Sequence, residues 1–201
     1  MQSLPESVDD RACSSWDNDD CEGSPYCPPR CPRFRDDTGT PLLVYPYEEI
    51  NRDGLRAMYE EFDAENRTKG LPPATPSQLE TWLDQLTTRG WNLVTICNDQ
   101  VVGHVSVAPV EAAEPELIIF VHPEFQNRGI GTEMLKQVIA YADHHDHDAL
   151  SLIVASDNDR AITVYENIGF DVVLQGIGIE MNLSLSNPLV DDVQLPPAER
   201  E

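Results

Sequence analysis

Lysine and other bases are scarce in this sequence. Lys69 and Lys136 are the only lysines, and Lys and Arg together number 13 against 36 Asp and Glu, which gives a formal net charge of −23 at pH 7. A surface of this kind would repel the phosphates of DNA or RNA and the headgroups of anionic lipids. The charge therefore argues against a nucleic acid or a membrane as a partner.

Long apolar runs are missing as well. No stretch approaches the roughly 20 apolar residues that a membrane span needs. The first residues, MQSLPESVDD, contain neither the basic nor the apolar segment of a secretory signal. We expect a soluble, cytoplasmic protein. Its 201 residues, 40% of them hydrophobic, suit one domain with additional segments at its ends.

The acidity is spread along the whole chain. The net charge is −5 over residues 1–41, −15 over residues 42–185 and −3 over residues 186–201. A domain of this size usually carries a net charge of about 2–8 in magnitude, so the middle segment repels itself in dilute buffer. These features resemble proteins adapted to a cytoplasm of molar salt, where the Debye length falls to about 3 Å. We favour this halophilic interpretation over an ordinary acidic protein.

Composition divides the chain into three parts. Residues 1–40 are rich in Pro, Asp, Ser and Cys and show no sustained periodicity, which predicts an irregular N-terminal segment. Residues 41–186 carry the apolar patterns of a folded domain. Residues 187–201 are polar and contain a Pro-Pro pair, which predicts a disordered acidic C-terminal segment.

The apolar patterns of the middle part predict an α/β (α+β) domain with about seven strands and about four helices. Strand-like runs occupy residues 42–47, 91–97, 101–107, 115–121, 149–155, 171–174 and 177–185. Helical spacing occupies residues 48–63, 77–90, 128–143 and 158–168. Ser77 with Glu80 forms a capping-box pattern. Asp157 or Asn158 is expected to cap the start of the last helix, and Gly169 to end it. Residues 64–76, with three prolines, form a loop.

The segment 117–142 is the most informative unit. A buried strand runs into Gln126-Asn127-Arg128-Gly129-Ile130-Gly131-Thr132, which opens an amphipathic helix. Glycines let a ligand approach the backbone closely, and a helix N-terminus favours an anion such as a pyrophosphate. The sequence has neither GxxxxGK[ST] nor GxGxxG, the usual phosphate-loop patterns. Taken alone, the segment could equally be a tight turn.

Two motifs, found in the expected order, favour anion binding over a tight turn. Gln126-x-x-Gly129-x-Gly131 resembles the acyl-CoA pyrophosphate loop of the GNAT superfamily of N-acyltransferases. Asn158-x-x-Ala161-x-x-x-Tyr165-x-x-x-Gly169-Phe170 is similar to the second signature of that superfamily. The resemblance covers residues 42–185. It implies the GNAT fold, a mixed, mostly antiparallel sheet that splays at its centre between residues 115–121 and 149–155.

The resemblance also implies a cofactor site for acetyl-CoA as co-substrate. The pantetheine arm would bond the backbone of Ile119, Phe120 and Val121, and Asn158 would contact it. The pyrophosphate would be held by the amides of the loop, which are those of Asn127, Arg128, Gly129, Ile130, Gly131 and Thr132. No metal is implied, because the thioester is already activated.

The implied activity is transfer of an acetyl group from acetyl-CoA to a primary amine by direct attack in a ternary complex. Tyr165 stands at the position of the acid that protonates the leaving thiolate, although a core tyrosine would show the same spacing. Glu116 stands where related enzymes often carry a glutamate base. Glu111, Glu114, His104 and His122 compete with it for this role.

The acceptor and the assembly stay open. A small-molecule or peptide amine is expected, and Arg67 and Lys69 in the loop 64–76 hint at an acceptor that carries a carboxylate. A monomer or a homodimer is expected. The alternative function is a catalytically idle GNAT-like domain that senses acyl-CoA or docks a partner through the Cys-rich segment.

Two clusters of metal-ligating residue types invite other interpretations. Cys13, Cys21, Cys27 and Cys31 are separated by seven, five and three residues, without a CxxC pair, so reduced thiols are favoured over a zinc site. His144, His145 and His147 follow a predicted helix, where such a cluster usually solvates a turn rather than binding a metal.

Overall fold

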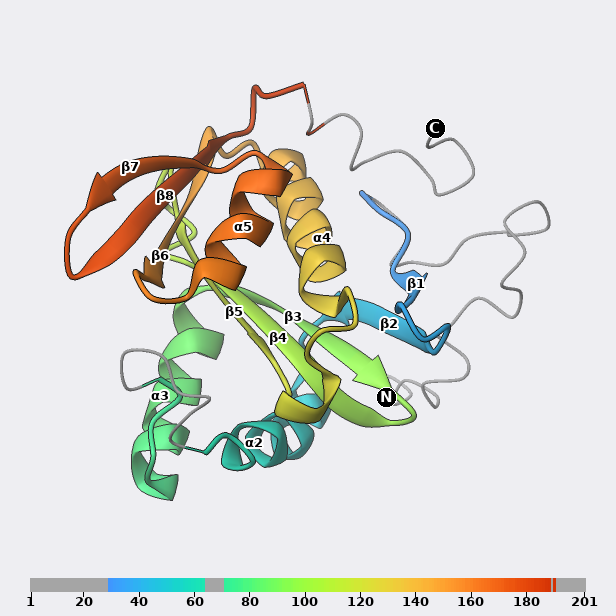
Figure 1. The fold of residues 1–201 in the computed structure, drawn as a ribbon. Coiled ribbons are helices and arrows are strands. Elements are labelled where there is room, and N and C mark those ends of the chain that lie inside the picture. The colour runs from blue at the N-terminus through green and yellow to red at the C-terminus, as the bar shows by residue number, and fades with distance from the viewer. Residues whose placement is uncertain (1–28, 64–70, 189, 191–201) are drawn as a thin grey trace, which may run out of the picture.

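The computed structural model describes residues 29–63, 71–188 and 190, and its ribbon is shown in Figure 1. The strands are β1 (Arg33–Arg35), β2 (Pro41–Pro46), β3 (Trp91–Cys97), β4 (Gln100–Ala108), β5 (Glu116–Val121), β6 (Ala149–Ala155), β7 (Asp171–Gln175) and β8 (Gly178–Ser184). The helices are α2 (Arg52–Glu60), α3 (Pro76–Arg89), α4 (Ile130–His144) and α5 (Asp159–Ile168), with 3₁₀ turns η1 (Glu49–Asn51) and η2 (Pro123–Phe125).

The strands form one sheet of eight in the order β1-β2-β3-β4-β5-β6-β8-β7. Neighbouring strands are antiparallel except β5 and β6, which are parallel. The predicted mixed, mostly antiparallel sheet is confirmed, and so are its seven predicted strands. The eighth, β1, lies in the segment predicted to be irregular, and that prediction is wrong for Arg33–Arg35. Arg33-Phe34-Arg35 is too short to show a period in its sequence. The strand forms because Phe34 pairs with Leu42 and packs on the core.

Alternation along the strands separates two apolar clusters on opposite faces of the sheet. Leu42 and Val44 of β2 join the cluster that packs under α4 and α5. Leu43 and Tyr45 join the cluster that packs under α2 and α3. Figure 1 shows α4 and α5 side by side across the central strands, with α2 and α3 apart from them. The sheet is thus covered by a different helix pair on each face.

The middle of the sheet opens between β5 and β6. Their register contains a single pair, Glu116 with Ser151, whereas β4 and β5 pair from Glu116 to Val121. Beyond Glu116 the two parallel strands diverge, which confirms the predicted splay. α4 follows β5 and α5 follows β6, so both helices begin at the divergent, carboxyl ends of these strands.

The observed ends of α5 agree with the ends predicted from its capping residues. The Asn158 side chain accepts a hydrogen bond from the Ala161 N–H at 3.1 Å, and Gly169 ends α5 in the left-handed conformation (φ 107°). The start of α3 was placed wrongly at Ser77. The observed cap is Thr75, whose Oγ1 accepts from the Gln78 N–H, with Pro76 as the first helical residue. Pro favours that first position because its missing N–H has no intrahelical acceptor there.

Residues at both ends of the domain pack onto it. We call residues 29–40 the strap. The strap lies against α4, where the Arg30 guanidinium pairs with Glu133 at 2.8 Å and the Gln137 side chain donates to the Cys31 carbonyl. Val190 is buried against the α4 side of the core, so the prediction of disorder from residue 187 is wrong at this position, where an apolar contact holds the chain. Among the helices that the structure describes, none is long and apolar enough to cross a membrane.

Candidate active site

The divergence of β5 and β6 leaves a cavity of about 390 Å³ between these strands, α4 and α5. Its walls combine strand backbone, the starts of two helices and the loop residue Leu71. The lining residues are Phe62, Leu71, Glu116, Leu117, Ile118, Ile119, Phe120, Val121, Gln126, Gly131, Leu135, Leu152, Ile153, Val154, Asn158, Arg160, Ala161, Val164 and Tyr165. The cavity therefore brings together seven predicted site residues from three separate segments: Glu116, Ile119, Phe120, Val121, Gly131, Asn158 and Tyr165.

One end of the cavity is built to receive an anion. α4 begins at Ile130, so the N–H groups of residues 130–132 have no acceptor within the helix, while the Glu133 N–H bonds to Gly129. Asn127 and Gly129 adopt left-handed conformations (φ 62° and 77°) that turn the loop into the helix. A Cβ atom at Gly131 would lie 3.7 Å from the nearest Val121 side-chain atom, so the glycine leaves free space on the cavity side.

The Arg128 side chain, in contrast, is engaged with the strap. Its Nε donates to Asp36 Oδ2 at 2.6 Å, and its guanidinium lies over the Phe125 ring at 4.8 Å from the centroid. The Asp36 side chain is fully buried. Burial alone raises the pKa of Asp36, but hydrogen bonds from Thr38, Thr40 and Arg128 outweigh it and hold the pKa below its usual value. The charge of Arg128 is thus balanced by a protein carboxylate.

Asn127, Arg128, Gly129, Ile130 and Thr132 are not among the residues that line the cavity. Ile130 is buried in the core, and Asn127 is exposed. The roles predicted for these residues concern their backbone amides. Asn158 has a double position, because its Oδ1 caps α5 while the residue also lines the cavity.

Tyr165 faces the cavity from the second turn of α5. It packs against Phe170 at 5.9 Å between ring centroids, and its hydroxyl makes no hydrogen bond to any residue that the structure describes. Burial raises the pKa of Tyr165 to about 12. The phenol is therefore protonated at every working pH, and its proton is available to a ligand.

Glu116 is the acid that reaches the cavity. It is exposed and stands at the point where β5 and β6 separate. Glu114, by comparison, accepts a hydrogen bond from the Asn182 side chain at 3.1 Å. Neither Glu111 nor Glu114 is among the described residues that line the cavity.

Both histidines that competed with Glu116 are buried in hydrogen-bonded positions. Asn92 uses its amide N–H groups on the Leu86 and Gly90 carbonyls, so its Oδ1 accepts from Nε2 of His104 at 2.9 Å. Nδ1 of His104 then accepts from the Tyr59 hydroxyl at 2.6 Å. Burial lowers the pKa of His104 to about 3, which keeps it neutral. His122 caps η2 through Nδ1.

Aromatic rings form the wall of the cavity on the α2 and α3 face. Phe120 meets Phe62, Tyr59 and Trp82 edge-on, with centroids 5.5 to 5.9 Å apart. Phe62 and Phe120 line the cavity. Among the described residues that line the cavity on this face, Glu116 is the charged one. Arg67 and Lys69, the bases predicted to face the acceptor, lie outside the described residues.

The metal-ligating residue types do not gather in the described part of the chain, where no group of three or more could hold an ion. Cys31 is a free thiol, and Cys13, Cys21 and Cys27 lie outside the described residues. The His145 ring stacks on Trp91 and Tyr141, and His147 hydrogen-bonds the Ala112 carbonyl. Ring stacking and turn contacts account for these two histidines.

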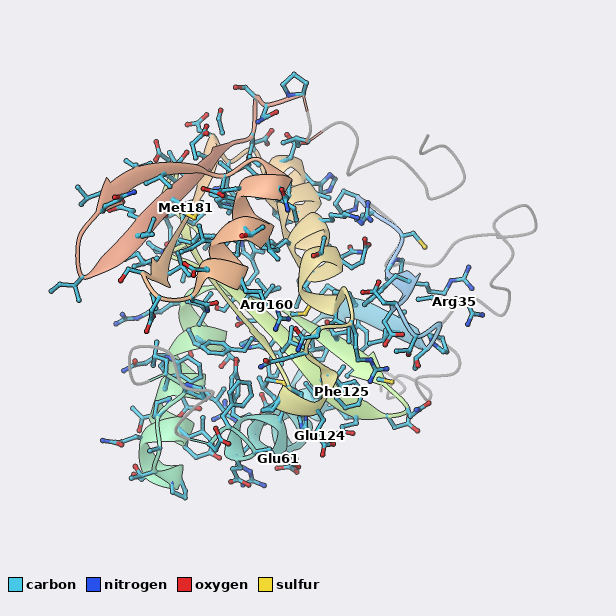
Figure 2. The ribbon with its side chains drawn as sticks, viewed as in Figure 1. Arg35, Glu61, Glu124, Phe125, Arg160 and Met181 are labelled. Atoms are coloured by element: carbon cyan, nitrogen blue, oxygen red, sulfur yellow. The ribbon has the colours of Figure 1, made fainter. Side chains whose placement is uncertain are left out.

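Sequence reasoning missed several residues of the cavity. Arg160, two residues after Asn158, is the charged one among them, and Figure 2 labels it at the beginning of α5, near the middle of the sheet. An exposed arginine that closely follows two aspartates looks like a solvated surface residue. Its position between the two signature residues Asn158 and Ala161 was the available signal.

Comparisons with known proteins agree with this geometry. The sequence model of the acetyltransferase (GNAT) family matches residues 55–170. The L-amino acid N-acetyltransferase AaaT of Escherichia coli K12 is 30% identical over 138 residues, which cover 65% of this chain and 83% of that protein. N-acetyltransferase MJ1207 of Methanocaldococcus jannaschii is 40% identical over 53 residues, which cover 26% of this chain. That match spans about a quarter of the archaeal protein (24%).

Solved structures show the same fold. The GNAT domain of S. lividans PAT superposes with a TM-score of 0.65 at 16% identity, covering 76% of this chain and 95% of that domain. The acetyltransferase yncA of Salmonella typhimurium, solved with its cofactor acetyl-CoA, superposes with a TM-score of 0.62 at 20% identity, covering 72% and 94%. With the family match over more than half of the chain, the conclusion is that this protein belongs to the acetyltransferase (GNAT) family.

Proposed function

We propose that this protein transfers an acetyl group from acetyl-CoA to a primary amine, by direct attack within a ternary complex. The observation that carries the proposal is the cavity, because it places unpaired β5 backbone, the start of α4, Asn158 and Tyr165 around one space. The acetyl-CoA bound to the structural neighbour yncA supports the choice of donor.

The cavity residues fit the parts of acetyl-CoA. The free N–H groups at the start of α4 would hold the pyrophosphate, and the space at Gly131 admits it. The open edge of β5 at Ile119–Val121 would bond the pantetheine amides as a neighbouring strand would. When bound, acetyl-CoA supplies an activated acetyl thioester at the middle of the splay.

The chain's own residues then have three tasks. Glu116 accepts a proton from the attacking amine, directly or through water. A backbone N–H of residues 119–121 stabilises the negative charge on the acetyl oxygen. As the new C–N bond forms and the C–S bond breaks, Tyr165 donates its proton to the leaving sulfur. The buried surroundings raise the pKa of Tyr165, and they disfavour a free thiolate for the same reason.

The acceptor is proposed to be a small-molecule or peptide amine on the α2 and α3 face, where Phe62 and Phe120 present an apolar wall. Amino acids are the first class to test, since the relative AaaT is an L-amino acid N-acetyltransferase. We further propose a cytoplasm of high salt as the working medium, from the net charge of −23.

A thiol-release assay with acetyl-CoA in molar KCl tests the proposal. The panel contains amino acids, polyamines, aminoglycosides and peptide N-termini, and calorimetry measures acetyl-CoA affinity in parallel. Turnover with any amine supports the transferase. Tight acetyl-CoA binding without turnover across the panel would favour the idle acyl-CoA sensor instead.

A further inference from the structure

Arg160 is a cavity residue without a partner among the described residues. It lies in the first turn of α5 (Figure 2), it is exposed, and it lines the cavity together with Asn158 and Ala161. No ion pair or hydrogen bond joins its side chain to any residue within 29–63, 71–188 or 190. A guanidinium that faces a cavity without a counter-ion is available to an anionic ligand.

The bases around the start of α4 are already engaged. Arg128 pairs with Asp36, and both Arg30 and Lys136 pair with Glu133. The three residues that precede Arg160 are Asp157, Asn158 and Asp159, two of them acids. Without Arg160 this end of the cavity would present acids to an anion, in a protein that is strongly negative overall.

Topology places Arg160 at the anion end of the cavity. Because β5 and β6 are parallel, α4 and α5 begin at the same edge of the sheet, so Gly131 and Arg160 share one end. Tyr165 lies five residues further along α5, about 7.5 Å at 1.5 Å per residue. The reacting centre is therefore about one and a half helical turns away from Arg160.

The same topology separates Arg160 from the acceptor. α5 covers the face of the sheet that α4 covers, with Ala161 and Val164 in the same apolar cluster. Phe62 and Phe120 belong to the cluster on the opposite face. A carboxylate on the acceptor would thus lie across the sheet from Arg160, whereas a phosphate at the start of α4 lies on its own side.

We propose that Arg160 binds a phosphate group of the acyl-CoA donor and is the cationic side chain of the anion end, while Arg128 serves the loop through Asp36. This inference rests on the proposed function, because it presumes acyl-CoA in the cavity. A charge-assisted guanidinium–phosphate contact is planar and often bidentate, which an amide at the same position cannot reproduce.

Calorimetry with two donors tests the proposal. Arg160→Gln is compared with the unchanged protein for binding of acetyl-CoA and of S-acetylpantetheine, which lacks every phosphate. The expected result is a roughly ten- to hundredfold loss of acetyl-CoA affinity, in line with one charge-assisted contact, and an unchanged response to S-acetylpantetheine. Where the smaller donor binds too weakly for calorimetry, kcat/KM at low donor concentration replaces Kd.

The matched control is Arg89→Gln. Arg89 is also an exposed arginine without a partner among the described residues, but it ends α3 outside the cavity lining. The acetyl-CoA affinity of the Arg89→Gln variant should equal that of the unchanged protein. Dephospho-acetyl-CoA, which lacks the 3′-phosphate, shows which phosphate Arg160 contacts. If Arg160→Gln no longer lowers the affinity for this donor, the contact is with the 3′-phosphate. If the affinity loss persists, the contact is with the pyrophosphate.

Three outcomes would overturn the role of Arg160. They are full acetyl-CoA affinity in a folded Arg160→Gln variant, an equal loss with both donors, and a change confined to the KM of a carboxylate-bearing acceptor. Failure of the unchanged protein to bind acetyl-CoA is a different result, because it refutes the proposed function itself.

Discussion

Tyr165 combines two properties that a proton donor needs. Its hydroxyl has no hydrogen-bond partner among the described residues, and burial raises its pKa to about 12. The first property leaves the proton free for the ligand, and the second keeps the phenol protonated. A tyrosine that served only packing would need neither a free hydroxyl nor a place on the cavity wall.

Replacing Tyr165 by Phe should lower kcat by about 10²–10⁴, because the ring stays and the proton donor is lost. Acetyl-CoA affinity by calorimetry should change little. The loss should shrink with an acyl donor whose leaving group is more acidic, since that group needs no proton. With a pKa of about 12, deprotonation of Tyr165 should add no falling limb to the pH–rate profile below about pH 10. A near-normal kcat together with a lower Tm would indicate a purely structural tyrosine.

Gly131 tests the space at the start of α4. Gly131→Val should fold, because the added Cβ would lie 3.7 Å from the Val121 side chain, an ordinary contact distance. The valine should reduce acetyl-CoA affinity at least tenfold, because it fills the free space on the cavity side of the start of α4. Gly176→Val is the control, since that glycine lies between β7 and β8 with its nearest neighbour atom 3.9 Å from an added Cβ. Equal affinity in both variants would remove Gly131 from the donor site.

At the scale of secondary-structure elements, the strap contacts the candidate site although it lies outside the residues that match the family model. It begins before residue 55, where that match starts, and it delivers Asp36 to Arg128 and the Asp37 N–H to the Arg128 carbonyl. The strap therefore fixes both the side chain and the backbone of the residue that precedes Gly129.

Asp36→Asn should destabilise the fold by about 2–4 kcal/mol, because it removes the charge partner of Arg128 from a buried position. Asp37→Asn, the same change at the exposed neighbouring residue, should stay within about 0.5 kcal/mol. Urea unfolding of both variants in molar KCl measures the difference. Similar losses in the two would mean that the pair with Arg128 contributes nothing specific.

His104 on β4 should give the fold a defined sensitivity to acid. Its pKa is about 3 in the folded protein against an ordinary value of 6.5, so between these values the unfolded chain binds a proton that the folded chain refuses. Stability should therefore be full above about pH 6.5 and fall as the pH drops, by up to about 1.4 kcal/mol per pH unit from this residue. In His104→Gln that share of the slope should vanish. Urea midpoints between pH 7 and pH 4 report it, and identical slopes would contradict the assignment.

The elements that could be predicted from sequence are those fixed by neighbouring residues. Asn158 and Gly169 mark the ends of α5 because capping acts within a few positions, and β6 follows from one short apolar run. The contacts of the strap with Arg128 and α4 could not be predicted, because they join residues about 100 positions apart. The start of α3 was misplaced because two overlapping patterns, at Thr75 and at Ser77, satisfy the same capping rule.

The candidate site also contains residues that local sequence predicts and residues that only distant packing brings to it. Gly131, Asn158 and Tyr165 belong to motifs that local spacing reveals, and the structure places all three on the cavity. Arg160 and Phe62 reach the same cavity only through the packing of α5 and of the chain after α2. Nothing in the spacing distinguishes them from an ordinary surface arginine and an ordinary core phenylalanine.

At the scale of the whole molecule, charge is the dominant property. The chain carries a net charge of −23, and ion pairs in the described part of the chain engage Arg30, Arg52, Arg56, Arg128 and Lys136. Acids outnumber bases by 36 to 13, so most acids have no basic side chain to balance them. Folding therefore concentrates like charge, and mobile ions are needed to screen it.

We expect the Tm to rise steeply with KCl up to the molar range, because screening relieves the repulsion that folding creates. A sucrose series of matched osmolality is the control, since sucrose stabilises by exclusion and does not screen charge. Thermal unfolding in both series separates the two effects. A flat KCl profile, or equal gains in sucrose, would remove the high-salt interpretation.

The strap has a consequence for the order in which this protein assembles. Its contacts reach Arg128, Glu133 and Gln137 across 92, 103 and 106 positions. The ribosome makes these three residues long after the strap has emerged, so the strap can pair with β2 early but can contact α4 only once that helix has been made. Loop closure over such a distance is slow compared with forming a hairpin or a helix turn. The strap therefore fixes the start of α4 later than it pairs with β2, and the anion end of the cavity matures after that edge of the sheet.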